Sequence, residues 1–458
     1  MLMLLSLFAM AADPVFSSGS YGRVQVSSDL GGGGGDSVRV AQFAPRLELG
    51  PYMELDLAWD WQPSDGPNFL VLITPALSGD LFHYDGNFAE ALGMRNFYAS
   101  ATGIGGLPIE LWAGSRMYRG DDVYLLDFWP LDNLNTYGGG AIWRPGQSEL
   151  ALHVGANRLV GDDFQFQSVR VFTPDGVTGE DVLFLDRQKV IASLRAQHHF
   201  DLGGGLTFRG KLYGEAHTLP SGERVLDDAF DQLMGQELPA DDGILLGAQA
   251  SLWGWADQSF VHVWTRYATG LAAYGELAIP SDGLSLDLST TGARSFLTAA
   301  MVNTETPRVG LMAATYVSNR VDADGQEVDF DDRWEWVGVV RPQVYVGRHV
   351  ALGVEASHQY VRPNGLNPRS GTFDQGHLTK FSLIPAVQRD RGGYSRPRLH
   401  VLYTASFLND GARRFFNPLD ARLSDGVQHY VGIGAEWWVN TRRVIAPVDV
   451  DRRTQDEE

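Results

Sequence analysis

The chain has 458 residues, no cysteine and a formal net charge of −20 at pH 7. The absence of cysteine excludes disulfides and thiolate metal sites, and the acidic balance argues against nucleic acid as a partner, because phosphate binding requires a basic surface. The length allows one large domain or two to three ordinary ones, and no shift in composition marks a boundary between domains.

The first eleven residues have the composition of an export signal. "MLMLLSLFAMA" is apolar, and Ala9-Met10-Ala11 has the small-x-small pattern of a cleavage site. A positively charged start is missing, so a short apolar N-terminal strand or helix is the alternative. No later segment has eighteen consecutive apolar residues, and the sequence therefore predicts no membrane-spanning helix.

From there on, apolar and polar residues alternate with a period of two, which is typical of strands with one apolar and one polar face. Gly-, Asp-, Asn- and Pro-rich connections such as "LGGGGGD" separate the alternating segments, and helical periodicity is weak throughout. In chain order the clearest strands are "YGRVQVS" (21–27), "YMELDLAWDW" (52–61), "PIELWAGSRMY" (108–118), "SFVHVWTRYA" (259–268), "RLHVLYTASF" (398–407) and "HYVGIGAEWWV" (429–439).

Two all-β architectures have this pattern, a soluble sandwich or propeller and an outer-membrane barrel. Charged residues in the middle of strands favour the barrel, because a dry core would not accept them unpaired whereas a water-filled lumen would. At roughly 22 to 25 residues per strand and connection, about 18 strands are expected. We expect a signal peptide at 1–11, a transmembrane antiparallel β-barrel at 12–440 and a polar, periplasmic tail at 441–458. The mid-strand charges are Arg23, Glu54, Glu110 and Arg116.

One segment, "LWAGSRMYRGDDVYLLDFW" (111–129), closely resembles the strand and constriction loop of maltoporins, the trimeric sugar-specific porins of Gram-negative outer membranes. In it, Glu110 to Tyr118 is expected to be a strand with Trp112, Arg116 and Tyr118 facing inward, and Arg119 to Asp127 to begin a loop that folds into the pore. The further segments that resemble this family, in the same order, are "SYGRVQV", "RLELGPYMELDLAW", "YSRPRLHVLYTASF" and "GIGAEWW".

The resemblance implies an 18-stranded barrel with an inward-folded third loop, an aromatic slide and an ionic track. Sugar rings stack on aromatic side chains, while their hydroxyls exchange hydrogen bonds with charged groups. Carried over by position, the slide consists of Tyr21, Tyr52, Trp129, Tyr394 and Trp438. The track consists of Arg23, Arg46, Glu54, Arg95, Arg119, Asp122 and Asp127. Strand alternation places Tyr21 with Arg23, and Tyr52 with Glu54, on shared inward faces. It also places Trp438 on the same face as Glu436 and directs Trp437 outward.

Some positions depart from the family pattern. The track arginine before Asp122 falls on Gly120, and the adjacent Arg119 is the candidate replacement. A mid-chain slide aromatic falls near Val263, where either Phe260 or Trp264 could serve. The slide residue that a neighbouring subunit donates could be Tyr84 or Phe88, and the family has no counterpart to the 18-residue tail.

Other chemistries were weighed for the same residues. Asp121 and Asp122 could be calcium ligands, Glu110 with either aspartate could be a glycosidase pair, and His198 and His199 could suggest a metal. No catalytic or phosphate-binding motif supports an enzyme, and the histidines fit a strand that leads into a tight turn. We expect no catalytic residue, cofactor or metal.

The sequence therefore predicts an outer-membrane channel for facilitated diffusion of sugars, with maltodextrin-like oligosaccharides as substrate, membrane lipid around it and a homotrimeric assembly. Two alternatives stay open. One is a general diffusion porin on the same scaffold, and the other is a soluble all-β carbohydrate-binding protein.

Overall fold

The computed structural model describes residues 14–79, 91–157, 166–172, 179–185, 187–227, 233–276, 279–325 and 329–440. The expected signal peptide (1–11) and polar tail (441–458) lie outside these ranges, as do Tyr84 and Phe88. Within the described ranges, strands begin at Val15 and end at Val439.

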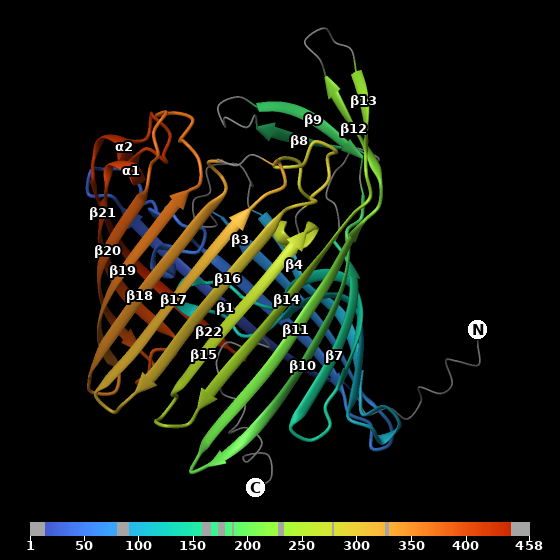
Figure 1. The fold of residues 1–458 in the computed structure, drawn as a ribbon. Coiled ribbons are helices and arrows are strands. Elements are labelled where there is room, and N and C mark those ends of the chain that lie inside the picture. The colour runs from blue at the N-terminus through green and yellow to red at the C-terminus, as the bar shows by residue number, and fades with distance from the viewer. Residues whose placement is uncertain are drawn as a thin grey trace, which may run out of the picture.

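The chain forms an antiparallel barrel of 18 strands (Figure 1). The barrel is closed because β1 pairs with β2 on one side and with β22 on the other, which confirms the predicted fold class. Strand β5 includes Arg119 and so continues one residue beyond the predicted end. The barrel strands are β1 (Val15–Ser28), β2 (Tyr52–Trp61), β3 (Asn68–Ser78), β4 (Ala91–Thr102), β5 (Ile109–Arg119), β6 (Asn133–Trp143), β7 (Ser148–Ala156), β10 (Val190–Gly203), β11 (Leu206–Leu219), β14 (Asp241–Trp253), β15 (Phe260–Gly270), β16 (Arg294–Glu305), β17 (Val309–Val321), β18 (Arg333–Val346), β19 (Val350–Pro363), β20 (Gly376–Gln388), β21 (Arg398–Leu408) and β22 (Val427–Val439).

Alternation along each strand separates an apolar outer face from a largely polar lumen. In β11, Leu212 points outward and is 67% exposed, whereas its neighbours Lys211 and Tyr213 point inward and are both 4% exposed. An apolar outer wall around a polar interior is the arrangement that a barrel in a lipid bilayer requires.

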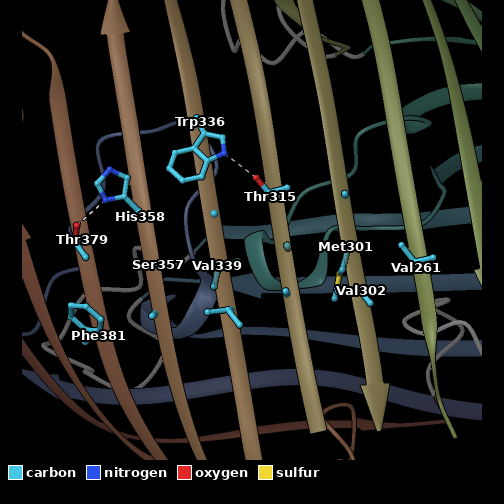
Figure 2. A pocket seen from close by; sticks show the side chains of 16 residues that line it. Val261, Met301, Val302, Thr315, Trp336, Val339, Ser357, His358, Thr379 and Phe381 are labelled. Carbon is cyan, nitrogen blue, oxygen red and sulfur yellow. Dashed lines mark hydrogen bonds between the residues drawn. The ribbon is translucent and has the colours of Figure 1, made fainter. Parts of the chain in front are cut away.

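The outer wall also pairs its own polar atoms. A groove of about 520 Å³ crosses β15 to β20, with Trp336 and Phe381 beside it (Figure 2). The indole N–H of Trp336 donates to Thr315 Oγ1 at 3.1 Å, and Thr379 Oγ1 lies 2.8 Å from His358 Nδ1. Pairing of this kind lowers the cost of placing polar groups against hydrocarbon.

A second, four-stranded sheet lies beyond one end of the barrel (Figure 1) and was not predicted. Its strands come from two long connections, between β7 and β10 and between β11 and β14. They are β8 (Phe166–Phe172), β9 (Gly179–Leu185), β12 (Gly222–Asp227) and β13 (Leu233–Leu238). This end carries the longer connections, which face the cell exterior in barrels of this type.

Helices are few and short. Of those in the described ranges, none is long and apolar enough to cross a membrane. They are η2 (Arg46–Glu48), η3 (Ile104–Gly106), η4 (Tyr124–Leu126), η5 (Leu271–Tyr274), α1 (Asp410–Arg413) and α2 (Ala421–Ser424).

Candidate functional site

The connection between β5 and β6 (residues 120–132, here loop 3) folds into the barrel, as the resemblance implied. Its helix η4 is buried, with Leu125 0% exposed. Apolar side chains of loop 3 pack against inward-facing apolar side chains of β15 to β18, so this part of the barrel wall is apolar on both faces. The wall residues in the cluster include Phe260, Trp264, Leu297, Met301, Met312, Tyr316 and Val337.

The connection between β1 and β2 (residues 29–51, here loop 1) also enters the barrel. The backbone N–H groups of Val40 and Ala41 donate to Gln359 Oε1 at 3.0 and 3.2 Å. The Phe43 ring stacks on Phe128 of loop 3 with ring centres 4.0 Å apart. The sequence predicted only a glycine-rich connection here, because contacts with strands three hundred residues away leave no local periodicity.

A third inward segment is the turn between β20 and β21 (residues 389–397). Its Tyr394 ring lies 4.9 Å from the Tyr124 ring of loop 3, and the N–H of Gly393 donates to Glu305 at 2.8 Å. Burial and the nearby Asp122 carboxylate raise the pKa of Tyr394 well above its usual value. The turn therefore lies against loop 3 beside Tyr124.

Glu436 of β22 joins the three inward segments. It accepts hydrogen bonds at 2.8 Å from both Arg46 of loop 1 and Arg396 of the turn. The Arg46 guanidinium lies 4.2 Å from the Tyr124 ring centre, and the Arg396 guanidinium lies 4.5 Å from the centre of the Trp438 ring. One carboxylate thus neutralises two arginines that each stack on an aromatic ring. Arg396, Tyr124 and Glu436 were not among the predicted site residues.

Tyr21 and Arg23 of β1 extend this network. The Tyr21 hydroxyl accepts from Arg46 at 2.9 Å and from Arg23 at 3.3 Å. Arg23 also pairs with Asp127 of loop 3 at 3.4 Å. Tyr21 is only 2% exposed, so its ring lies beneath the charged groups around it.

Strand β2 supplies a second charged group beside the first. The Tyr52 hydroxyl donates to Glu54 and accepts from Arg95 Nε at 2.8 Å, while Arg95 and Glu54 lie 3.5 Å apart. The rings of Tyr52 and Tyr21 are 5.9 Å apart. The structure therefore brings together eight predicted residues: Tyr21, Arg23, Arg46, Tyr52, Glu54, Arg95, Asp127 and Trp438.

The remaining predicted residues lie elsewhere on or against loop 3. The Arg119 guanidinium stacks over Trp129, 4.0 Å from the ring centre. At Gly120 an added Cβ would collide with the carboxylate of Asp132, so a side chain at this position would have to displace a carboxylate that pairs with Arg195 at 2.8 Å.

The two mid-chain candidates for the slide, Phe260 and Trp264, both point inward and are both buried. Phe260 is 2% and Trp264 1% exposed, whereas Val263 between them points outward. The ring centre of Phe260 lies 6.0 Å from that of Tyr394, another candidate slide residue.

Two carboxylates of the alternative chemistries, those of Asp121 and Glu110, are paired with basic neighbours. Asp121 is bound by Arg209, Lys211 and Gln249. Burial opposes ionisation of Asp121, but Lys211 and Arg209 hold its pKa well below the usual range. Glu110 pairs with Arg116 at 2.7 Å and Arg144 at 3.0 Å. Neither acid resembles a calcium ligand or a proton donor for glycoside hydrolysis.

Space for a solute remains beside the inward loops. A cavity of about 840 Å³ is lined by loop 1, by Leu126 and Asp127 of loop 3, and by β1. A narrower space of about 40 Å³ adjoins Glu436. Although the chain is strongly acidic, this narrow space is lined by five arginines, Arg23, Arg46, Arg341, Arg396 and Arg398.

Comparison with known proteins bears on this arrangement. A family model described as LamB porin matches residues 16–438. The chain belongs to the LamB porin family. It is therefore an outer-membrane channel of a Gram-negative bacterium, as the closed barrel with its apolar outer wall requires. No curated protein sequence matches this LamB-family porin.

Solved structures with a similar overall fold are distant in sequence. OccAB1 of Acinetobacter baumannii is 10% identical over 94% of this chain and 98% of its own, with a TM-score of 0.47. OprD from Pseudomonas aeruginosa is 10% identical over 94% and 95%, with a TM-score of 0.42. OmpT of Vibrio cholerae is 9% identical over 93% and 98%, with a TM-score of 0.38.

Proposed function

We propose that this LamB-family porin carries oligosaccharides of the maltodextrin type across the outer membrane by facilitated diffusion. The observation that carries the proposal is a row of aromatic side chains on three adjacent strands. Trp438 of β22 is the register partner of Tyr21 in β1, and Tyr21 lies beside Tyr52 of β2. Charged groups flank both ends of this row, Arg396 at Trp438 and Arg95 at Tyr52.

The row suits a chain of sugar rings. Pyranose faces are apolar and stack on aromatic rings, whereas the hydroxyls at the ring edges bind guanidinium and carboxylate groups. Several weak adjacent contacts allow fast entry and release, which a single tight site would prevent. Tyr52 and Trp438 are partly exposed, so we assign the stacking contacts to these two and a supporting position to Tyr21.

A general diffusion porin remains the second candidate, because Tyr21 is almost fully covered and the row is interrupted there. Proteoliposome swelling separates the two functions. A sugar-specific channel should admit maltotriose faster than a neutral, non-sugar solute of equal size. Equal rates for the two solutes would favour the general porin.

Single substitutions test the stacking contacts. Tyr52→Ala or Trp438→Ala should weaken oligosaccharide block of the ion current several-fold, since one aromatic contact contributes about 0.5–1.5 kcal/mol, while the open conductance changes little. A matched control should block like the wild type: Trp437→Ala alters the neighbouring tryptophan, whose indole N–H donates outward to Ser20. Tyr52→Phe keeps the ring but removes the hydroxyl that contacts Glu54 and Arg95, and it should retain more of the block than Tyr52→Ala. Unchanged block in Tyr52→Ala and Trp438→Ala would remove both residues from the sugar path.

We further propose a homotrimer, as the family resemblance implies. Light scattering of the detergent-solubilised protein, corrected for bound detergent, should give the mass of three chains. A mass of one chain would contradict this assembly.

A further inference from the structure

Five aspartates crowd into the connection between β17 and β18, residues 322–332, on the side of the barrel with the longer loops. One carboxylate oxygen from each of Asp322, Asp324 and Asp329 lies within 4.8 Å of the others. Three negative charges at this spacing repel one another strongly. This arrangement of carboxylates is stable only if a cation binds there or if some of the carboxyl groups keep their protons.

Asp329 distinguishes this cluster from an ordinary acidic surface. The residue is only 5% exposed. One of its carboxylate oxygens accepts a hydrogen bond from the N–H of Asp331 at 3.3 Å. The other, Oδ2, is buried and has no hydrogen-bond donor among the described residues. Burying an unpartnered carboxylate oxygen is costly, and the Asp329 carboxyl group points into the cluster with Asp322 and Asp324.

The flanking arginines engage other groups. Arg320 lies over the Tyr274 ring, 5.4 Å from its centre, and Arg333 pairs with Glu335 at 2.7 Å. Each guanidinium thus has a partner outside the cluster of Asp322, Asp324 and Asp329.

We propose that Asp322, Asp324 and Asp329 bind a calcium ion. Calcium takes six to eight oxygen ligands at about 2.3–2.6 Å, so oxygens around one ion lie no more than roughly 5.2 Å apart. The three carboxylate oxygens, which lie within 4.8 Å of one another, meet this condition. Magnesium keeps several of its waters and is usually bound through only one or two carboxylates, so a site with three carboxylates favours calcium.

The ion would stabilise the contacts among three exterior loops. The N–H of Ala323 donates to the carbonyl of Gly283 at 3.0 Å, in the connection between β15 and β16. On the other side, the N–H of Asn364, which follows β19, donates to the carbonyl of Asp332 at 2.7 Å. Neutralising the cluster would hold the middle loop in the conformation that makes both contacts.

Terbium luminescence tests the site directly, because terbium replaces calcium at oxygen ligands and is excited through nearby aromatic rings. The Tyr274 hydroxyl lies 3.1 Å from the N–H of Ala323, next to Asp322. The full chain, folded in detergent and stripped with EGTA, should show a saturable terbium signal on aromatic excitation. Added calcium should displace terbium at lower concentrations than magnesium.

Variants assign the signal to the cluster. Asp329→Asn should weaken terbium and calcium binding by about tenfold or more, since affinity in such sites follows the number of charged ligands. Asp201→Asn changes an exposed aspartate near the end of β10 and should bind like the wild type. A heat-dependent shift in gel mobility checks that each barrel is folded. If Asp329→Asn does not fold, the partly exposed Asp324→Asn provides the same test.

Three results would overturn the proposal. The first is the absence of a saturable signal from the wild type, which would mean that the cluster holds protons alone. The second is equal binding by the folded cluster variant and Asp201→Asn. The third is tighter binding of magnesium than of calcium, which would contradict the choice of ion.

Discussion

Replacing Glu436 by glutamine is expected to lower the free energy of unfolding by about 3 kcal/mol, because two buried arginines then lose their shared counter-charge. The side chains of Arg46 and Arg396 are 7% and 1% exposed, so water screens them poorly. Urea unfolding of the protein in lipid vesicles, followed by tryptophan fluorescence, measures the change. The same variant should shift permeability toward anions, since the narrow space keeps its five arginines and loses the one carboxylate that lines it.

A matched carboxyl-to-amide change serves as the control. Asp390 pairs with Arg348 on the surface, where both side chains are more than half exposed, and Asp390→Asn should leave stability and ion selectivity unchanged. If Glu436→Gln behaved like Asp390→Asn in both measurements, Glu436 would not be the residue that joins loop 1, loop 3 and the 389–397 turn.

Shortening Leu125 to alanine is expected to loosen loop 3. Leu125 is fully buried between loop 3 and the barrel wall, and a buried leucine-to-alanine change costs about 2–5 kcal/mol. Leu125 belongs to loop 3 itself, so much of the lost free energy should appear as local release of loop 3 from the barrel wall. We expect single-channel recordings to show a higher and noisier conductance.

Leu152→Ala makes the same chemical change on the outer face of β7, where Leu152 is 53% exposed. Its conductance should equal that of the wild type. An unchanged, quiet conductance in Leu125→Ala would show that the apolar cluster does not hold loop 3 in place.

Period-two alternation predicted much of the wall around the candidate site. It placed Tyr21 with Arg23, Tyr52 with Glu54, and Trp438 with Glu436. In the structure the two members of each pair share contacts, either around the Glu436 carboxylate or around the Glu54 carboxylate. Alternation succeeds here because neighbouring side chains of a strand point to opposite faces whatever the rest of the chain does.

The inward segments were harder to predict, because their positions depend on distant partners. Loop 3 was expected only through the family resemblance. Loop 1 was missed, although the apolar Val38, Val40 and Phe43 amid polar and glycine residues were a usable signal. Tyr124 and Arg396 were missed for the same reason, since both lie in connections without periodicity.

Gly120 shows how a departure from the family pattern can have a local cause. The sequence left open whether Arg119 takes over from the arginine that Gly120 replaces. The structure places Asp132 where a side chain at position 120 would be, and stacks Arg119 on Trp129 instead. Glycine at position 120 thus leaves room for the Asp132 carboxylate at the start of loop 3.

The central claim is that sugars bind in the constriction while they pass through it. Ion current through wild-type channels in a planar bilayer, with maltohexaose added in increasing concentration, tests this most directly. The account predicts a saturable fall in current with a defined half-blocking concentration. Current that stays constant, or that falls only as much as with a size-matched neutral polymer, would contradict it.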